Sequence, residues 1–170
     1  MAEKREITND IQTMIQEVHI VKTLVGTWRA LGLPKSQPRP RAFVRNGRAA
    51  VYDAGTAEGW KSDVARACRE LEGRSMIHPL AVTLTFYMPR PKSHYRANGT
   101  LKDSSPRFLH DRKPDADNLA KAVLDALTGI KAWHDDDQVC ELLILKRWEI
   151  PHAEAPGCTI TISELKEHEL

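Results

Sequence analysis

Two short segments of the sequence carry carboxylates at a spacing that can do chemistry. Asp115 and Asp117 stand two residues apart, directly after Pro114, where an extended approach gives way to a helical pattern. At such a boundary both carboxylates can turn toward one point, which two residues so spaced inside a regular helix do not do. Lys121 follows Asp117 by four residues, one turn along the same helical face. The spacing therefore predicts two acids and one cation near the start of one helix.

The second acidic segment is Trp133-His-Asp-Asp-Asp-Gln, which leads into an apolar pattern typical of a strand. The helix between the two segments, of about 11 residues, runs roughly 16 Å. The connection after Gly129 covers that distance if it is nearly extended. We therefore expect Asp136 to join Asp115 and Asp117, either in the same subunit or across a dimer.

The five carboxylates of the two segments predict a metal site. They repel each other in a partly desolvated site, and a divalent cation relieves that repulsion. Oxygen ligands, with no histidine or cysteine pair at ligand spacing, favour magnesium over zinc. Such a site hydrolyses phosphodiesters by activating water and neutralising charge in the transition state. Lys121 would add positive charge at the scissile phosphate or the leaving oxygen.

Each of these residues also has a simpler interpretation. Asp115 suits a helix N-cap, and Lys121 suits an ion pair with Asp117 across one turn. Residues 135–137 suit a polar turn before a strand. Their joint occurrence favours a site, and an EF-hand is excluded because its glycine and distal glutamate are missing. His134, beside the acids, is the one histidine with a candidate role.

Basic residues gather in two segments, although the formal net charge is only +2. Residues 34–48 carry five lysines and arginines without an acid, and residues 90–113 are also strongly basic. Two basic segments beside a carboxylate cluster suit a polyanion brought to a bound metal. The simpler alternative is solvated surface. The candidate DNA contacts are Lys35, Arg39, Arg41, Arg90, Lys92 and Lys113.

Hydrophobic periodicity predicts the elements that position these residues. With 170 residues, of which 41% are hydrophobic, the chain fits one globular domain. Helices are expected over 7–20, 56–71 (N-cap Thr56) and 115–127, strands over 23–32, 80–88, 139–150 and 158–165, and a hairpin over 43–52 with Asn46-Gly47 at its turn. The long loop 89–114 favours a binding role or disorder.

The element order β-α-β-α-β-β predicts an α+β fold, a small mixed sheet with helices packed on it. Residues 1–22 are expected to be an N-terminal helical extension, with Val18 on its apolar face, and residues 23–170 the main domain. Cys68, Cys140 and Cys158 form no pair at metal or disulfide spacing and are expected to be small buried hydrophobes. With no membrane-spanning run and no signal peptide, the protein is expected to be cytoplasmic.

The segment Lys113-Pro-Asp-Ala-Asp-Asn-Leu-Ala-Lys-Ala-Val-Leu-Asp-Ala-Leu-Thr-Gly, followed by Trp133-His-Asp-Asp-Asp-Gln-Val and Lys146, resembles the RusA crossover-junction endodeoxyribonucleases, especially phage-borne members. Supporting stretches begin at Gly32 and Met88, and the resemblance extends over approximately residues 24–165.

The resemblance implies a homodimer that makes paired cuts in four-way DNA junctions during recombination and repair. It implies Mg²⁺, with Mn²⁺ as a substitute, in a bacterial or phage-infected bacterial cell. It assigns catalysis to Asp115, Asp117, Lys121 and Asp136, the last anchored on Gln138-Val139. The three acids are the implied metal ligands, and the neighbouring Asp135 is a further candidate ligand.

Three functional alternatives stay open. Within the same class, the substrate is other branched DNA, such as a replication fork. In a second class, the protein binds junctions without useful catalysis, and the acids are structural. In a third, it is a metal-dependent hydrolase of nucleotides, for which a small closed pocket would be expected.

Overall fold

The computed structural model describes residues 18–37, 41–45, 48–52 and 57–169. Its strands are β1 (Val18–Leu31), β2 (Arg41–Arg45), β3 (Arg48–Tyr52), β4 (Leu80–Met88), β5 (Val139–Trp148) and β6 (Gly157–Glu169). Its α-helices are α2 (Glu58–Ala67) and α3 (Ala116–Gly129), and single 3₁₀ turns are η1 (Arg69–Leu71), η2 (Lys92–His94) and η3 (Asp136–Gln138).

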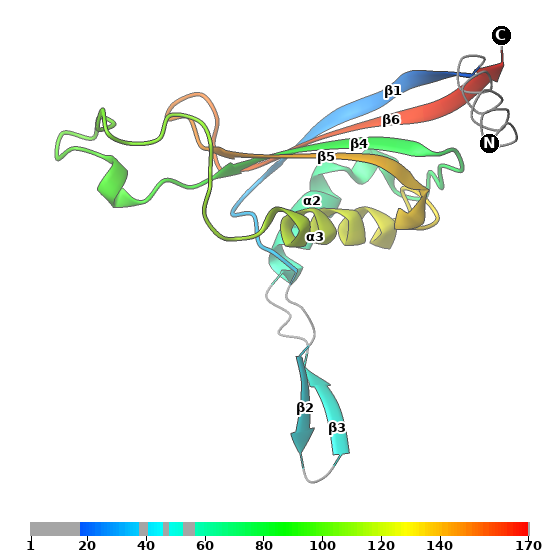
Figure 1. Ribbon diagram of the computed structural model, residues 1–170, viewed down its shortest axis with the longest axis horizontal. Coiled ribbons are helices and arrows are strands. Elements are labelled where there is room, and N and C mark those ends of the chain that lie inside the picture. Colours follow the sequence, from blue (N-terminus) through cyan, green and yellow to red (C-terminus); the bar gives the residue numbers. More distant parts are fainter. Residues whose placement is uncertain (1–17, 38–40, 46–47, 53–56, 170) are drawn as a thin grey trace, which may run out of the picture.

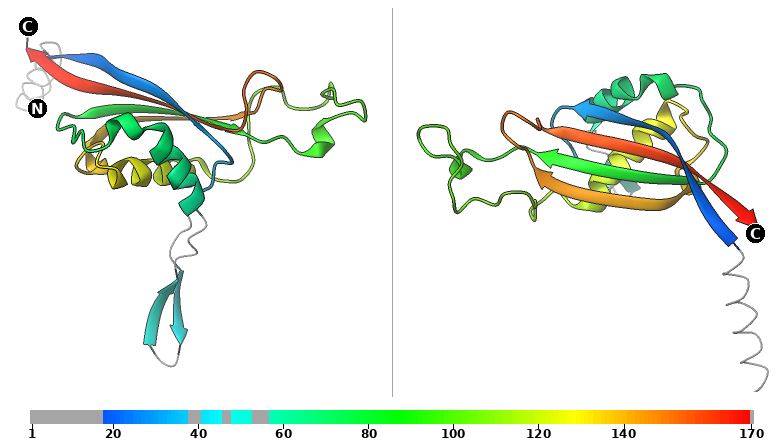
Figure 2. Two further views of the ribbon diagram at one scale, coloured as in Figure 1. Left: turned by 180° about the vertical axis from the view of Figure 1, so that it is seen from behind. Right: turned by 90° about the horizontal axis from the view of Figure 1, so that it is seen from above.

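The main sheet has the strand order β1-β6-β4-β5. β4 and β5 are parallel, and the other neighbours are antiparallel. A parallel pair needs a crossover, and here α3 provides it. Both helices lie on one face of the sheet (Figures 1 and 2). This confirms the α+β fold with a small mixed sheet, while the homodimer stays a prediction.

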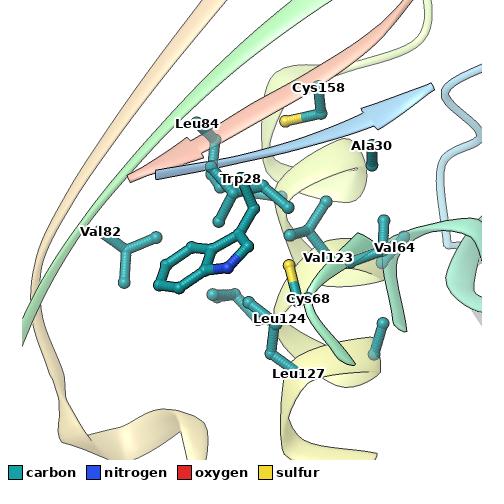
Figure 3. Packing of buried hydrophobic residues seen from close by; sticks show 14 of the residues in the cluster. Trp28, Ala30, Val64, Cys68, Val82, Leu84, Val123, Leu124, Leu127 and Cys158 are labelled. Atoms are coloured by element: carbon teal, nitrogen blue, oxygen red, sulfur yellow. The ribbon is translucent and has the colours of Figure 1, made fainter. Parts of the chain in front are cut away.

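The core lies between that face of the sheet and the two helices. On β4, Val82, Leu84 and Phe86 alternate with half-buried residues, as a one-sided strand requires. On α3 the buried residues recur every three or four positions and form one apolar stripe, so the helix is anchored along its whole length. Figure 3 shows Trp28 of β1 among the side chains of both layers, with its indole toward Leu124 and Leu127.

β1 begins five residues earlier than predicted. It pairs with β6 over its full length, from Val18 opposite Glu169 to Leu31 opposite Gly157. The expected helix over 7–20 is therefore wrong for residues 18–20, because non-local pairing outweighs local periodicity. The rest of that expected helix, residues 7–17, lies outside the described residues.

The other boundaries differ less. α2 begins after its N-cap residue, Ala57, and η1 completes the predicted span to Leu71. The predicted cap, Thr56, lies outside the described residues. The hairpin is confirmed as β2 and β3, which project from the helix side of the body (Figure 1). Cys68 and Cys158 are buried as predicted, but Cys140 is exposed. It has no partner on β4, because the register shifts between Leu80 and Ala81. No helix in the described ranges is long and apolar enough to cross a membrane.

Candidate active site

The start of α3 presents its acids to solvent. Asp115 is the N-cap residue, but its side chain makes no cap hydrogen bond, and both Asp115 and Asp117 are exposed. The interpretation of Asp115 as a helix cap is therefore not realised. Lys146 of β5 holds the approach to the helix, since its Nζ donates to the carbonyls of Arg112 and Pro114 at 2.6 Å each. The carboxylate of Asp115 thus sits on an anchored backbone and is free to bind a ligand.

The side chain of Lys121 is held by an acid one turn further along the same helix. Its Nζ lies 3.4 Å from Oδ1 of Asp125, one turn further on. The other oxygen of Asp125 lies 3.4 Å from Nζ of Lys61 on α2. Asp125 thus bridges two cations from two helices, and this arrangement directs Lys121 toward the C-terminal half of α3.

The second acidic segment is a tight turn that Gln138 organises. Its Oε1 accepts from the backbone N–H of His134 at 2.8 Å and of Asp135 at 3.2 Å. Its Nε2 donates to the carbonyl of Met76 at 2.9 Å, which ties the turn to the segment before β4. The positions of the acids in this turn are thereby set by one amide side chain.

Asp135 and Asp136 interact directly. A hydrogen bond with the Asp135 carboxyl, burial and the negative charge of Asp135 together raise the pKa of Asp136. The same hydrogen bond lowers the pKa of Asp135, and His134 adds a small effect in that direction. Lys121 opposes the shift of Asp136 through its positive charge. Two adjacent carboxyls that share a hydrogen bond thus resist carrying charge together.

These groups line one cavity of about 440 Å³ at the C-terminal end of α3. Its lining residues are Lys61, Lys121, Asp125, Thr128, Gly129, Asp135 and Asp136. Asp115 and Asp117 are not among them, because they lie at the other end of α3, a helix that spans about 20 Å. In the described part of one chain, no three acids, histidines or cysteines converge as a metal site. One chain therefore presents two acidic groups, with Lys121 between them.

Comparison with known proteins assigns the chain to a family. The family of endodeoxyribonuclease RusA matches residues 32–163, a range that includes both acidic segments. The chain belongs to this family. It is also similar to the uncharacterized protein YqaN of Bacillus subtilis (strain 168), with 30% identity over 136 residues that make up 79% of this chain and 92% of YqaN. RusA membership implies a DNA endonuclease that resolves Holliday junctions.

Among the predicted DNA contacts of this RusA-family chain, Arg90 is buried. Its guanidinium donates to the carbonyls of Pro106 (2.7 Å), Arg107 (2.6 Å) and Glu149 (2.9 Å). Arg90 thus holds loop 89–114 together, and its donors are largely taken up by backbone carbonyls. The exposed candidates are Lys35, Lys92 and Lys113. Arg39 and the side chain of Arg41 lie outside the described residues.

Sequence reasoning missed the two charged residues Lys61 and Asp125 of the cavity in this RusA-family chain. Asp125 carried a signal, since it follows Lys121 by four residues and can pair with it on one helix face. Lys61 carried none, because its approach to Asp125 depends on how α2 packs against α3.

Proposed function

We propose that the protein is a magnesium-dependent homodimeric endonuclease that resolves four-way DNA junctions by paired cuts, in DNA recombination and repair. Each catalytic site combines Asp115 and Asp117 of one subunit with the partner subunit's Asp136. Family membership supports the activity. The separation of the two acidic groups by the length of α3 supports the shared site.

The shared site follows from two-fold symmetry. An axis that crosses α3 at right angles puts the N-terminal end of one helix opposite the C-terminal end of its partner. Each dimer then has two equivalent sites. The outer side of α3 suits this role, since Asp117 and Lys121 are exposed while the opposite face is buried. A four-way junction has approximate two-fold symmetry and presents two strands to such a pair of sites.

The donor set fits a hard divalent cation. Asp115, Asp117 and Asp136 supply carboxylate oxygens, and Asp135 is placed to supply another. Because the pKa of Asp136 is raised mainly by Asp135, a bound cation would relieve an existing conflict between the two carboxyls. Mg²⁺ is the ion that this chemistry favours, with Mn²⁺ as a substitute. When bound, it would supply an activated water and neutralise charge at the phosphate.

The protein's own residues hold the catalytic groups in place and assist cleavage of the phosphodiester bond. Lys121, held by Asp125, puts a positive charge beside the scissile phosphate, where charge develops as the bond breaks. Gln138 fixes the turn that carries Asp136. Lys146 fixes the backbone that precedes Asp115. The proposed DNA contacts are Lys35, Arg39, Arg41, Lys92 and Lys113.

A subunit-mixing experiment tests the shared site. Asp117→Asn and Asp136→Asn are each expected to abolish cleavage of a labelled four-way junction in Mg²⁺. In a mixed dimer of the two variants, a shared arrangement leaves one site with both changes and one site intact, so cleavage of one strand returns. An arrangement within one subunit leaves both sites damaged, and the mixture stays inactive.

Two controls complete the test. A mixture of Asp115→Asn with Asp117→Asn should remain inactive, because both residues belong to the same group and no intact site forms. Linear duplex of the same sequence, and junction in EDTA, should not be cut by the unaltered protein. Intact junction after incubation with unaltered protein and Mg²⁺ would favour the alternative of a junction-binding protein without catalysis.

A further inference from the structure

A second cavity, of about 430 Å³, lies where loop 89–114 leaves the sheet. Three apolar side chains at the end of β4 and the start of the loop form one side, Met88, Pro89 and Pro91. Trp148, the last residue of β5, and His110 of the loop form another. The volume falls within the range of pockets that bind small organic molecules, and the lining is mainly apolar.

The walls of this cavity are held in place without a ligand. The rings of His94 and His110 lie 4.8 Å and 4.3 Å from that of Trp148, measured between centroids. The guanidinium of Arg90 lies 5.8 Å from the same indole and clamps the loop through its backbone carbonyls. A cavity with such braced walls binds at low ordering cost.

Two polar atoms in these walls lack a partner. Nδ1 of His110 and Nε1 of Trp148 are buried and make no hydrogen bond. Buried polar groups are nearly always paired, because an unpaired one loses its hydration without compensation. Neither atom reaches the surface of the cavity, so the walls offer a ligand a mainly apolar and aromatic surface.

The rim of the cavity is positively charged. Arg112 and Lys113 are exposed lining residues, and none of the lining side chains is acidic. Lys113 stands two residues before Asp115, a backbone span of at most about 7 Å. A ligand with its anionic part on this rim would therefore lie next to the first acidic group.

An apolar, aromatic wall beside a positively charged rim suits a nucleotide, whose base is flat and whose phosphate is anionic. We infer that this cavity takes one unstacked nucleotide of the DNA strand beside Asp115, with its base against Met88, Pro91 and Trp148 and its phosphate on Arg112 and Lys113. The inference rests on the proposed function and adds a selectivity device to it. Bases at a strand exchange are easier to unstack than bases within a continuous duplex, so the cavity favours branched DNA.

An abasic scan tests the inference on the full-length protein. Four-way junctions carry a single abasic residue at successive positions through the crossover, and binding is measured in EDTA to prevent cleavage. One position per cut strand should bind roughly tenfold more weakly, the scale of a single base contact, while its neighbours change little. 2-Aminopurine at that position should brighten on binding. A flat abasic profile with unchanged fluorescence would overturn the inference and leave a site for phosphate only.

Lys113→Gln and Arg96→Gln form a pair of variants. Both cations are exposed and belong to the same loop, but only Lys113 lines the cavity, while Arg96 pairs with Asp103. Lys113→Gln should reduce the 2-aminopurine signal at saturating protein, and Arg96→Gln should leave it unchanged. Equal signals from the two variants would count against the cavity. Junction cleavage in Mg²⁺ with a flat abasic profile defeats this inference alone, whereas absence of any junction binding defeats the proposed function as well.

Discussion

Lys61 of α2 lies 3.4 Å from Asp125 of α3, whose other carboxylate oxygen faces Lys121. The pair ties the two helices together in the wall of the cavity that Asp135 and Asp136 also line. The orientation of Lys121, the proposed catalytic lysine, therefore depends on a residue of another helix.

Asp125→Asn should lower kcat for junction cleavage by roughly tenfold and leave the Kd for the junction nearly unchanged, because Lys121 loses its anchor but not its charge. Single-turnover cleavage and binding titrations measure the two quantities. Asp63→Asn is the matched control, since Asp63 pairs with Arg66 on the outer side of α2. Equal losses in both variants would contradict the role of Asp125.

Lys121→Ala should lower kcat roughly 100-fold, with a much smaller loss of junction affinity. The reason is that its charge is needed most when negative charge builds up at the phosphate. An equal loss in rate and affinity would instead identify Lys121 as a simple phosphate anchor.

Asp117→Asn should abolish cleavage and leave binding intact or tighter, because it removes a metal ligand and a negative charge near the backbone of the DNA.

Arg90→Gln should lower the free energy of unfolding by roughly 2–3 kcal/mol, because a buried cation that donates to several carbonyls is lost. It should leave the slope of log Kd against log salt unchanged, since the guanidinium donors are taken up by backbone carbonyls. Arg107→Gln is the control for stability, because Arg107 makes an exposed ion pair with Asp103.

Arg39→Ala with Arg41→Ala should weaken binding to junction and duplex alike. Each lost phosphate contact reduces the salt slope by about one. Salt titrations of both DNAs give this slope directly. A slope equal to that of the unaltered protein would show that neither arginine touches the DNA backbone.

Burial lowers the pKa of His110, and the positive charges of Lys146 and Arg112 act in the same direction, against Asp111. In the unfolded chain His110 takes up a proton below its ordinary pKa of 6.5, whereas in the folded protein it does so only at lower pH. The unfolded state therefore binds more protons in this window, and stability is lost as pH falls below 6.5. Urea unfolding at pH 7.5 and 5.5 should show the loss. His110→Phe should reduce it, and replacement of the exposed His168 by Asn should not.

The sequence predicted well where local pattern and long-range packing agree. β4 begins and ends where the alternation of Leu80 to Met88 does. β1 was underestimated because residues 18–22 are held by pairing with the far end of β6, which no local pattern reports.

The candidate site shows the same division. The acids and Lys121 were found from spacing, and the loop–helix boundary before α3 was placed within one residue. The burial of Arg90 was not foreseen, because a sequence counts charges without showing which are buried. Lys61 was missed because only the packing of α2 on α3 brings it to Asp125.

The homodimer is open to a direct measurement. Sedimentation at micromolar concentration should give twice the mass of one chain, because each proposed site needs two subunits. A chain beginning at Val18 keeps all of β1 and tests whether residues 1–17 contribute to the dimer. A monomer that still makes paired cuts would contradict the symmetric arrangement.

α3 is a 14-residue helix with an acidic group near each end, and its inner face is buried. In the proposed dimer its length of about 20 Å sets the distance between the two catalytic centres. The distance between the two phosphates cut together is then set by the length of this helix. Adding one helical turn to α3 would move the centres apart by about 5 Å, so the two cuts would fall on different phosphates or lose their pairing.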